Sequence, residues 1–161
     1  MSNEATAYLE REGACQRLDA WPEPSQLQPG DAIALCIPLS AAGAEAYVDY
    51  LESLSATDLE ISIAPFTCEA AGTFRLWALA AARIRLPAKQ RVEARHDLIG
   101  IRLAQVGVGF GADTLAGPVQ EDRHLPLAGM TRPNETTRAG LSALMELAGL
   151  EAEWAPEQDS Q

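Results

Sequence analysis

Two short apolar runs, each followed by a helix-like segment, constrain the fold of this chain more than any other feature. The runs are AIALCIPL (32–39) and LEISIAPF (59–66). A continuous apolar run of this length is typical of a strand that is covered on both faces. The segments that follow them, 43–55 and 73–84, repeat apolar residues at helical spacing. This order of elements predicts an α/β fold with a parallel sheet and right-handed crossovers.

A third strand is expected at RVEARH (91–96). Val92 and Ala94 alternate there with charged residues, and successive side chains of a strand point to opposite faces. We therefore expect one buried face and one polar face, the polar one made by Arg91, Glu93 and Arg95.

The chain after this strand is less regular. LIGIRLAQVGVGF (98–110) is compatible with a strand by its β-branched residues and with a helix by its length. The segment 131–150 carries Leu141, Leu144 and Met145 at helical spacing, which predicts a helix that ends near Gly149.

The two ends of the chain differ from this body. Residues 1–31 contain WPEPSQLQPGD, whose prolines and glycine favour an extended linker. We expect a flexible lead-in at 1–31, one domain at 32–150 and an acidic tail at 151–161.

Charge and hydropathy exclude some function classes. The formal net charge is −11, whereas nucleic-acid binding needs a basic face. No apolar run approaches the roughly 20 residues that span a bilayer. The first residues are acidic and lack an apolar stretch, unlike a secretory signal. We expect no nucleic acid, no membrane association and a cytoplasmic location.

The cysteines do not form a recognisable motif. Cys15, Cys36 and Cys68 are an odd number with wide spacing, which matches neither a disulfide framework nor the usual zinc spacing. We expect no metal site, and Cys36 as a small buried apolar residue.

The stretch QVGVGFGADTLAGP (105–118) is rich in glycine. It lacks the G-x-G-x-x-G spacing of a dinucleotide loop and the Gly-Lys-Ser/Thr of a P-loop. The other reason for such glycines is close packing of a helix against a strand, followed by a tight turn. We therefore expect the glycines to serve packing.

The same region resembles the last helix and last strand of a radical SAM family of menaquinone and deazaflavin biosynthesis, which includes aminofutalosine synthase, dehypoxanthine futalosine cyclase and the FO synthase subunits. The family typically reads G-x-K-x-A-Q-x-A-L-x-F-G-A-D-D-L-x-G-T-V-x-E-E. The positions shared here are Gly100, Ala104, Gln105, Val106, Phe110, Gly111, Ala112, Asp113, Leu115, Gly117 and Glu121. The resemblance extends over about 32–152.

The resemblance implies parallel β/α units that form roughly half of a TIM-type barrel, with 98–110 as a helix and ADTLAG (112–117) as a strand. The family's chemistry needs a C-x-x-x-C-x-x-C loop that holds an iron–sulfur cluster, and this chain has none. We therefore expect no cofactor on its own. S-adenosylmethionine and an iron–sulfur cluster would enter only if a partner chain supplied the cluster-binding half.

Candidate ligand-binding residues follow from these patterns. Asp113 and Glu121 match the family pattern, which implies a place near the barrel mouth. For Asp113 the other interpretation, which we favour, is that it caps or stabilises the turn. Thr114 and Pro118 depart from that pattern. Arg91, Glu93, Arg95 and His96 belong to a basic stretch at 83–102, which can form salt bridges with acidic surroundings or bind an anionic ligand or acidic partner.

Three functions remain open from the sequence. The first is a non-catalytic, accessory half-barrel that pairs with a second copy or with a cluster-bearing partner, because half a barrel leaves sheet edges uncovered. The second is a small-molecule binding protein that retains the barrel mouth. The third is a freestanding enzyme with acid–base chemistry.

Overall fold

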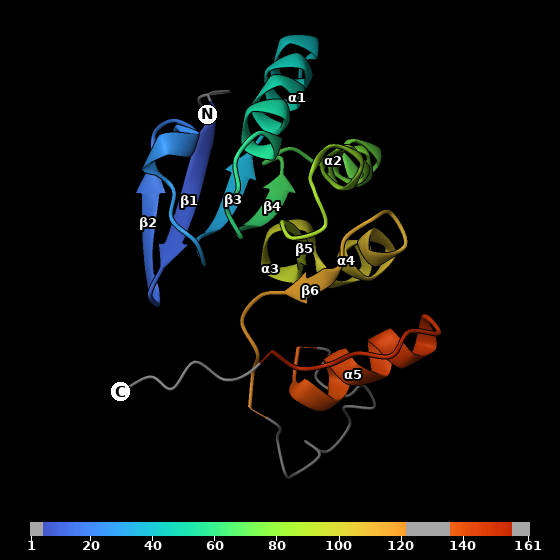
Figure 1. The fold of residues 1–161 in the computed structure, drawn as a ribbon. Coiled ribbons are helices and arrows are strands. Elements are labelled where there is room, and N and C mark those ends of the chain that lie inside the picture. The colour runs from blue at the N-terminus through green and yellow to red at the C-terminus, as the bar shows by residue number, and fades with distance from the viewer. Residues whose placement is uncertain (1–4, 122–135, 156–161) are drawn as a thin grey trace. The chain divides into compact units, whose positions relative to one another are not determined.

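The computed structural model describes residues 5–121 and 136–155, and the chain divides into two compact units, Met1–Ala116 and Gly117–Gln161. The first unit holds a six-stranded sheet with the order β2-β1-β3-β4-β5-β6 (Figure 1). The strands are β1 (Thr6–Arg11), β2 (Ala14–Leu18), β3 (Ala32–Cys36), β4 (Ser62–Phe66), β5 (Arg91–Arg95) and β6 (Thr114–Ala116). The helices are α1 (Ala41–Ser55), α2 (Gly72–Arg85), α3 (His96–Ile99), α4 (Ile101–Val108) and α5 (Arg138–Leu147), with a short 3-10 helix at Pro24–Gln26.

The α/β class and the mostly parallel sheet are confirmed. Strands β3, β4, β5 and β6 are parallel and lie beside one another in chain order. The segment 98–110 is helical, divided into α3 and α4 by Gly100 at a φ of 86°. The residues expected as the closing strand form β6.

The expectation of a flexible lead-in is wrong for residues 6–18. They form the antiparallel hairpin of β1 and β2, and β1 also pairs antiparallel with β3. Glu12 and Gly13 connect the two strands with positive φ values of 51° and 78°, the backbone of a tight hairpin turn. The prolines that suggested a linker lie only after the hairpin.

An ion pair between the half-exposed Arg11 and the buried Asp31 links the hairpin to the segment before β3. Arg11 donates two hydrogen bonds of 2.8 Å to the carboxylate of Asp31, whose side chain is 1% exposed. The hydrogen bond from Arg11 holds the pKa of Asp31 below its usual value. Further along, the Trp21 indole donates to the Cys36 carbonyl at 3.1 Å, so the proline-containing segment is anchored as well.

The helices of the first unit pack on one face of the sheet. In Figure 1, α1, α2 and α4 lie together on one side of the strands. Ile33, Ile63 and Val92 are in register across β3, β4 and β5 and are all buried. The buried Tyr47 of α1 donates to the Ala78 carbonyl of α2, which joins two helices of this layer.

The opposite face of the sheet is mixed. The buried apolar residues Ala34, Ala64 and Phe66 lie on it in β3 and β4, and charged residues lie on it in the flanking strands β1 and β5. This face, which we call the polar face, carries the alternate residues of the strands, among them Tyr8, Glu10, Ser62, Arg91, Glu93 and Arg95. The burial pattern of β5 confirms the predicted division, since Val92 and Ala94 are buried and the three charged residues are exposed or half-buried.

The second unit is built around α5. The helix predicted at 131–150 is described from Arg138 onward, with Thr137 accepting from the Gly140 amide as its N-cap; residues 131–135 lie outside the described part. The Arg138 guanidinium lies 4.6 Å from the centre of the Trp154 ring. No helix in the described part of the chain is long and apolar enough to cross a membrane.

Two glycines of the 105–118 stretch, Gly107 and Gly111, serve close packing, as predicted. A Cβ on Gly107 of α4 would lie 2.7 Å from Leu79 Cδ1 and 3.3 Å from Ala94 Cβ. At Gly111, which has a φ of 104°, a Cβ would lie 2.7 Å from Arg83 Cβ. Both positions therefore require glycine.

Replacing Gly107 by valine should lower the free energy of unfolding by about 1–3 kcal/mol, because the new side chain overlaps Leu79 and Ala94. The same substitution at Gly72 is the matched control, since the nearest atom there is Leu103 Cδ1 at 4.0 Å; its effect should stay within about 0.5 kcal/mol. Urea unfolding followed by circular dichroism measures both. Equal losses would contradict the packing role.

Candidate functional site

The carboxyl ends of β3, β4 and β5 bring together polar side chains that are far apart in the sequence. Parallel strands end at the same edge of a sheet, and ligands of α/β proteins bind beyond that edge. Here the edge is formed by Cys36, Thr67, Cys68, Arg75 and His96, which we call the carboxyl-end cluster.

Arg75 of α2 joins the elements of this cluster. Its guanidinium donates to the carbonyls of Thr67 at 2.7 Å and Glu69 at 2.9 Å, and at 3.5 Å to the carbonyl of Ile99. Its Nε is buried and has no hydrogen-bond partner among the described residues. Arg75 thus connects the loop after β4 to α3 and keeps one donor unused.

His96, the first residue of α3, is 7% exposed. Its Nε2 is buried and has no hydrogen-bond partner in the described part of the chain. Burial lowers the pKa of His96, and the neighbouring Asp97 opposes the shift, so the imidazole is neutral at pH 7. A neutral imidazole with an unused nitrogen can form a hydrogen bond with a ligand.

Two cysteines of the cluster are in contact. The Sγ atoms of Cys36 and Cys68 lie 3.2 Å apart, although both thiols are free. Cys36 is buried, as predicted, and Cys68 is exposed. The sequence spacing of 32 residues concealed this pair, because adjacent parallel strands bring distant residues together.

The polar face carries a second group of charges. Arg95 forms ion pairs with Glu10 at 3.5 Å and with Asp97 at 3.0 Å. Burial raises the pKa of Glu93, while a hydrogen bond with Ser62 and the charge of Arg95 oppose the shift. In the folded chain the protonated form of the Glu93 carboxyl group is therefore more favoured than it is in water.

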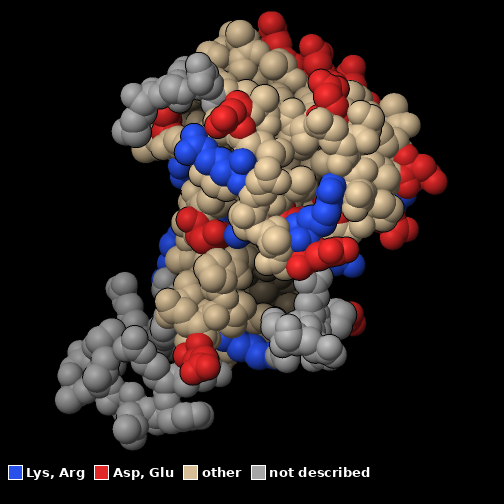
Figure 2. Space-filling model, turned by 90° about the vertical axis from the view of Figure 1, so that its left-hand side faces the viewer, with Lys and Arg blue, Asp and Glu red and all other residues tan. Residues whose placement is uncertain are grey.

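The basic stretch at 83–102 is largely neutralised by acidic residues. Its ion pairs, besides those of Arg95, are Arg83–Asp113, Arg85–Glu52 and Lys89–Asp58. On the side of the molecule shown in Figure 2, basic and acidic side chains are intermixed. The geometry thus favours the first of the two predicted roles, salt bridges with acidic surroundings. It does not favour a purely basic surface that would bind an anionic partner.

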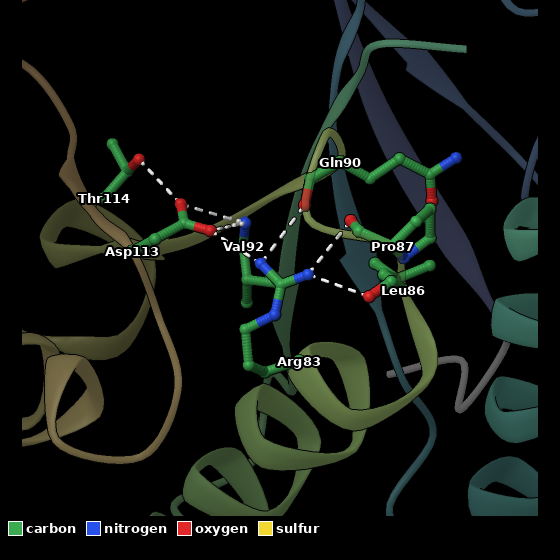
Figure 3. Close-up of polar contacts among 7 residues, drawn as sticks. All are labelled: Arg83, Leu86, Pro87, Gln90, Val92, Asp113 and Thr114. Atoms are coloured by element: carbon green, nitrogen blue, oxygen red, sulfur yellow. Dashed lines mark hydrogen bonds and ion pairs between the residues drawn. The ribbon is translucent and has the colours of Figure 1, made fainter. Parts of the chain in front are cut away.

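Asp113 belongs to a structural group of hydrogen bonds (Figure 3). It accepts from Arg83 at 2.8 Å, from the Val92 amide at 3.2 Å and from the Thr114 hydroxyl at 3.0 Å. Arg83 also donates to three carbonyl oxygens, those of Leu86, Pro87 and Gln90. These contacts join the end of α2 to the starts of β5 and β6.

The expectation that Asp113 lies near a barrel mouth is wrong. Asp113 precedes β6 and contacts the second residue of β5, so it lies at the amino ends of the strands. Glu121 is exposed and belongs to the second unit. Of the predicted residues, Arg91, Glu93 and Arg95 share the polar face, and His96 lies in the carboxyl-end cluster.

Metal binding finds no support in the described residues, where no three His, Cys, Asp or Glu side chains are grouped to hold an ion. Among the described residues, no nucleophilic side chain forms a hydrogen bond with the His96 imidazole. The cluster can accept a hydrogen-bonding ligand or undergo thiol chemistry. No protein-family model, curated protein or solved structure matches this chain.

Thr67, Cys68 and Arg75 were not among the site residues predicted from the sequence. The available signal was their position, because Thr67 and Cys68 directly follow a predicted strand and Arg75 opens the next predicted helix. In a parallel sheet such residues meet at one edge.

Replacing Arg83 by lysine should lower the free energy of unfolding by about 1–2 kcal/mol, because an ammonium cannot reach the four acceptors that the guanidinium fork reaches. Arg85→Lys is the matched control, since Arg85 forms an exposed pair with Glu52; its effect should stay within about 0.5 kcal/mol. Urea titration measures the free energy of unfolding of both variants. An Arg83→Lys variant as stable as the wild type would contradict the structural role of Arg83.

Replacing Glu93 by glutamine should stabilise the protein increasingly as pH rises. Burial raises the folded-state pKa of Glu93 above its ordinary value of 4.5, so the wild type loses stability from about that pH upward until Glu93 is ionised in both states. The glutamine side chain can still form a hydrogen bond with Ser62, and it carries no negative charge. Melting temperatures across pH 4 to 8 measure the difference, and Glu45→Gln, at an exposed position of α1, should show no such trend.

Proposed function

We propose that this protein is a non-catalytic, accessory half-barrel that acts by pairing, in the first instance with a second copy of itself. One observation carries the proposal: four parallel strands lie in chain order with their helices on one face, and they end in β6. Among the described residues, no strand pairs with the outer edge of β6. A β/α barrel continues the same pattern until its edges meet.

The hairpin defines the other edge of this half-barrel. Since β1 is antiparallel to both β2 and β3, β2 runs parallel to β3 and to β6. Two copies related by a two-fold axis along the barrel would therefore form two identical seams, each between β6 of one copy and β2 of the other. The polar face would then line the interior.

The resemblance to radical SAM enzymes supports a related role with a different partner. A cluster-bearing chain could complete the barrel in place of a second copy, and that chain would supply the iron–sulfur cluster and bind S-adenosylmethionine. The helix α4 and the strand β6 fall where the resemblance implies them. The three free cysteines suit the reducing cytoplasm, which we propose as its location.

Binding of a small polar molecule is the second candidate. The observation that favours it is the pair of buried nitrogens without partners among the described residues, Arg75 Nε and His96 Nε2. Buried polar groups are nearly always hydrogen-bonded, so a ligand at the carboxyl-end cluster would satisfy them. A stably folded monomer would favour this candidate over pairing.

The wild-type protein should run as a dimer in light scattering coupled to size exclusion. Thr114→Lys places a charge on the edge strand β6, a device that prevents strand pairing; it should raise the dimer dissociation constant at least about tenfold. Thr73→Lys makes the same change at an exposed position of α2 and should leave the dimer intact.

Hydrogen exchange locates the contact independently. Peptides that cover β2 and β6 should gain protection as protein concentration rises, whereas the central strand β4 should not change. A wild-type protein that stays monomeric at high micromolar concentration would refute self-pairing.

A further inference from the structure

The contact between Cys36 and Cys68 has no role in the proposed pairing. Cys36 is the last residue of β3, and Cys68 comes two residues after the end of β4. The parallel register pairs Cys36 with Phe66, so the chain at Cys68 continues directly past Cys36. The two Sγ atoms are 3.2 Å apart, within hydrogen-bond distance.

The two thiols differ in their surroundings. Cys36 is 6% exposed, and Cys68 is exposed to solvent. Burial and the neighbouring Cys68 raise the pKa of Cys36 to about 11, against opposing hydrogen bonds from the Cys68 backbone and from Thr6. Cys36 is therefore a protected thiol, whereas Cys68 is the sulfur that a dissolved oxidant meets first.

The loop that carries Cys68 is held in place. Arg75 donates to the carbonyls of Thr67 and Glu69, the residues on either side of Cys68. The indole of Trp21 donates to the Cys36 carbonyl. Both sulfurs are thus attached to backbone that other side chains position.

We propose that Cys36 and Cys68 are a dithiol redox site that a hydroperoxide converts to a reversible disulfide. The Cys68 thiolate attacks the peroxide, the O–O bond breaks, and water or an alcohol leaves, so that Cys68 becomes a sulfenic acid. The Cys36 sulfur then attacks the Cys68 sulfur. The S–S bond forms, the S–O bond breaks, and the hydroxyl group leaves as water with the proton of Cys36. The dithiol loses two electrons, and the peroxide is reduced.

The disulfide would link the ends of β3 and β4 at the carboxyl-end cluster. It closes a loop that contains α1 and β4, so the oxidised protein should resist unfolding better than the reduced one. A dithiol reductant should reverse both the bond and the stabilisation.

The test treats the reduced, full-length protein with hydrogen peroxide and then blocks the remaining thiols by alkylation. The intact mass should show the loss of two hydrogen atoms, and peptide mapping should find Cys36 joined to Cys68. Cys15→Ser should form the same link, because Cys15 lies on β2 and contacts neither of the other cysteines. Cys68→Ser should form no intramolecular disulfide.

Two measurements decide the outcome. Dithiothreitol should restore two alkylatable thiols, and the melting temperature of the wild type should rise on oxidation and fall on reduction. Cys68→Ser should show neither change, and as an exposed position it is suited to substitution without loss of folding. Oxidation that stops at a sulfinic acid on Cys68, with Cys36 still alkylated, would overturn the proposal, as would a link through Cys15.

Discussion

The parallel pairing of β3, β4, β5 and β6 in chain order is the constraint on which the rest of this structure depends. Each parallel pair requires a crossover connection, and crossovers of one hand place the connecting helices on the same face of the sheet. That face becomes the apolar core, with α4 brought close to β5 by the missing side chain of Gly107. The other face carries the charged residues of β1 and β5 beside the buried Ala34, Ala64 and Phe66. Burial there raises the pKa of Glu93.

The amino ends and the carboxyl ends of the parallel strands carry different groups of polar side chains. At the amino ends, Arg83 and Asp113 satisfy each other and the surrounding backbone, and they stabilise the start of β5. At the carboxyl ends, polar atoms are left without partners among the described residues, namely the Nε of Arg75 and the Nε2 of His96. Buried polar groups rarely stay unpaired. Such an atom also occurs at the amino ends, since Gln90 Oε1, directly before β5, has no partner among the described residues.

The hairpin of β1 and β2 determines which strand forms one edge of this sheet. It pairs antiparallel with the edge of β3, and the ion pair between Arg11 and the buried Asp31 holds it there. Removal of Arg11 would leave the buried Asp31 carboxylate without its ion-pair partner, which is destabilising. Any assembly through the sheet edges must therefore use β2 and β6, and the hairpin remains part of it.

The alternation of apolar runs and amphipathic segments was enough to determine the α/β class, the positions of α1, α2 and β5, and the two faces of β5, because these depend on local periodicity. The sequence also pointed to the packing role of its glycines. It did not reveal the hairpin, whose turn at Glu12 depends on a left-handed backbone, nor the end of the sheet at which Asp113 lies. Only the tertiary structure brought Cys36 and Cys68 together, because strand register decides which distant residues meet, and register is set by packing of the whole sheet rather than by any one segment.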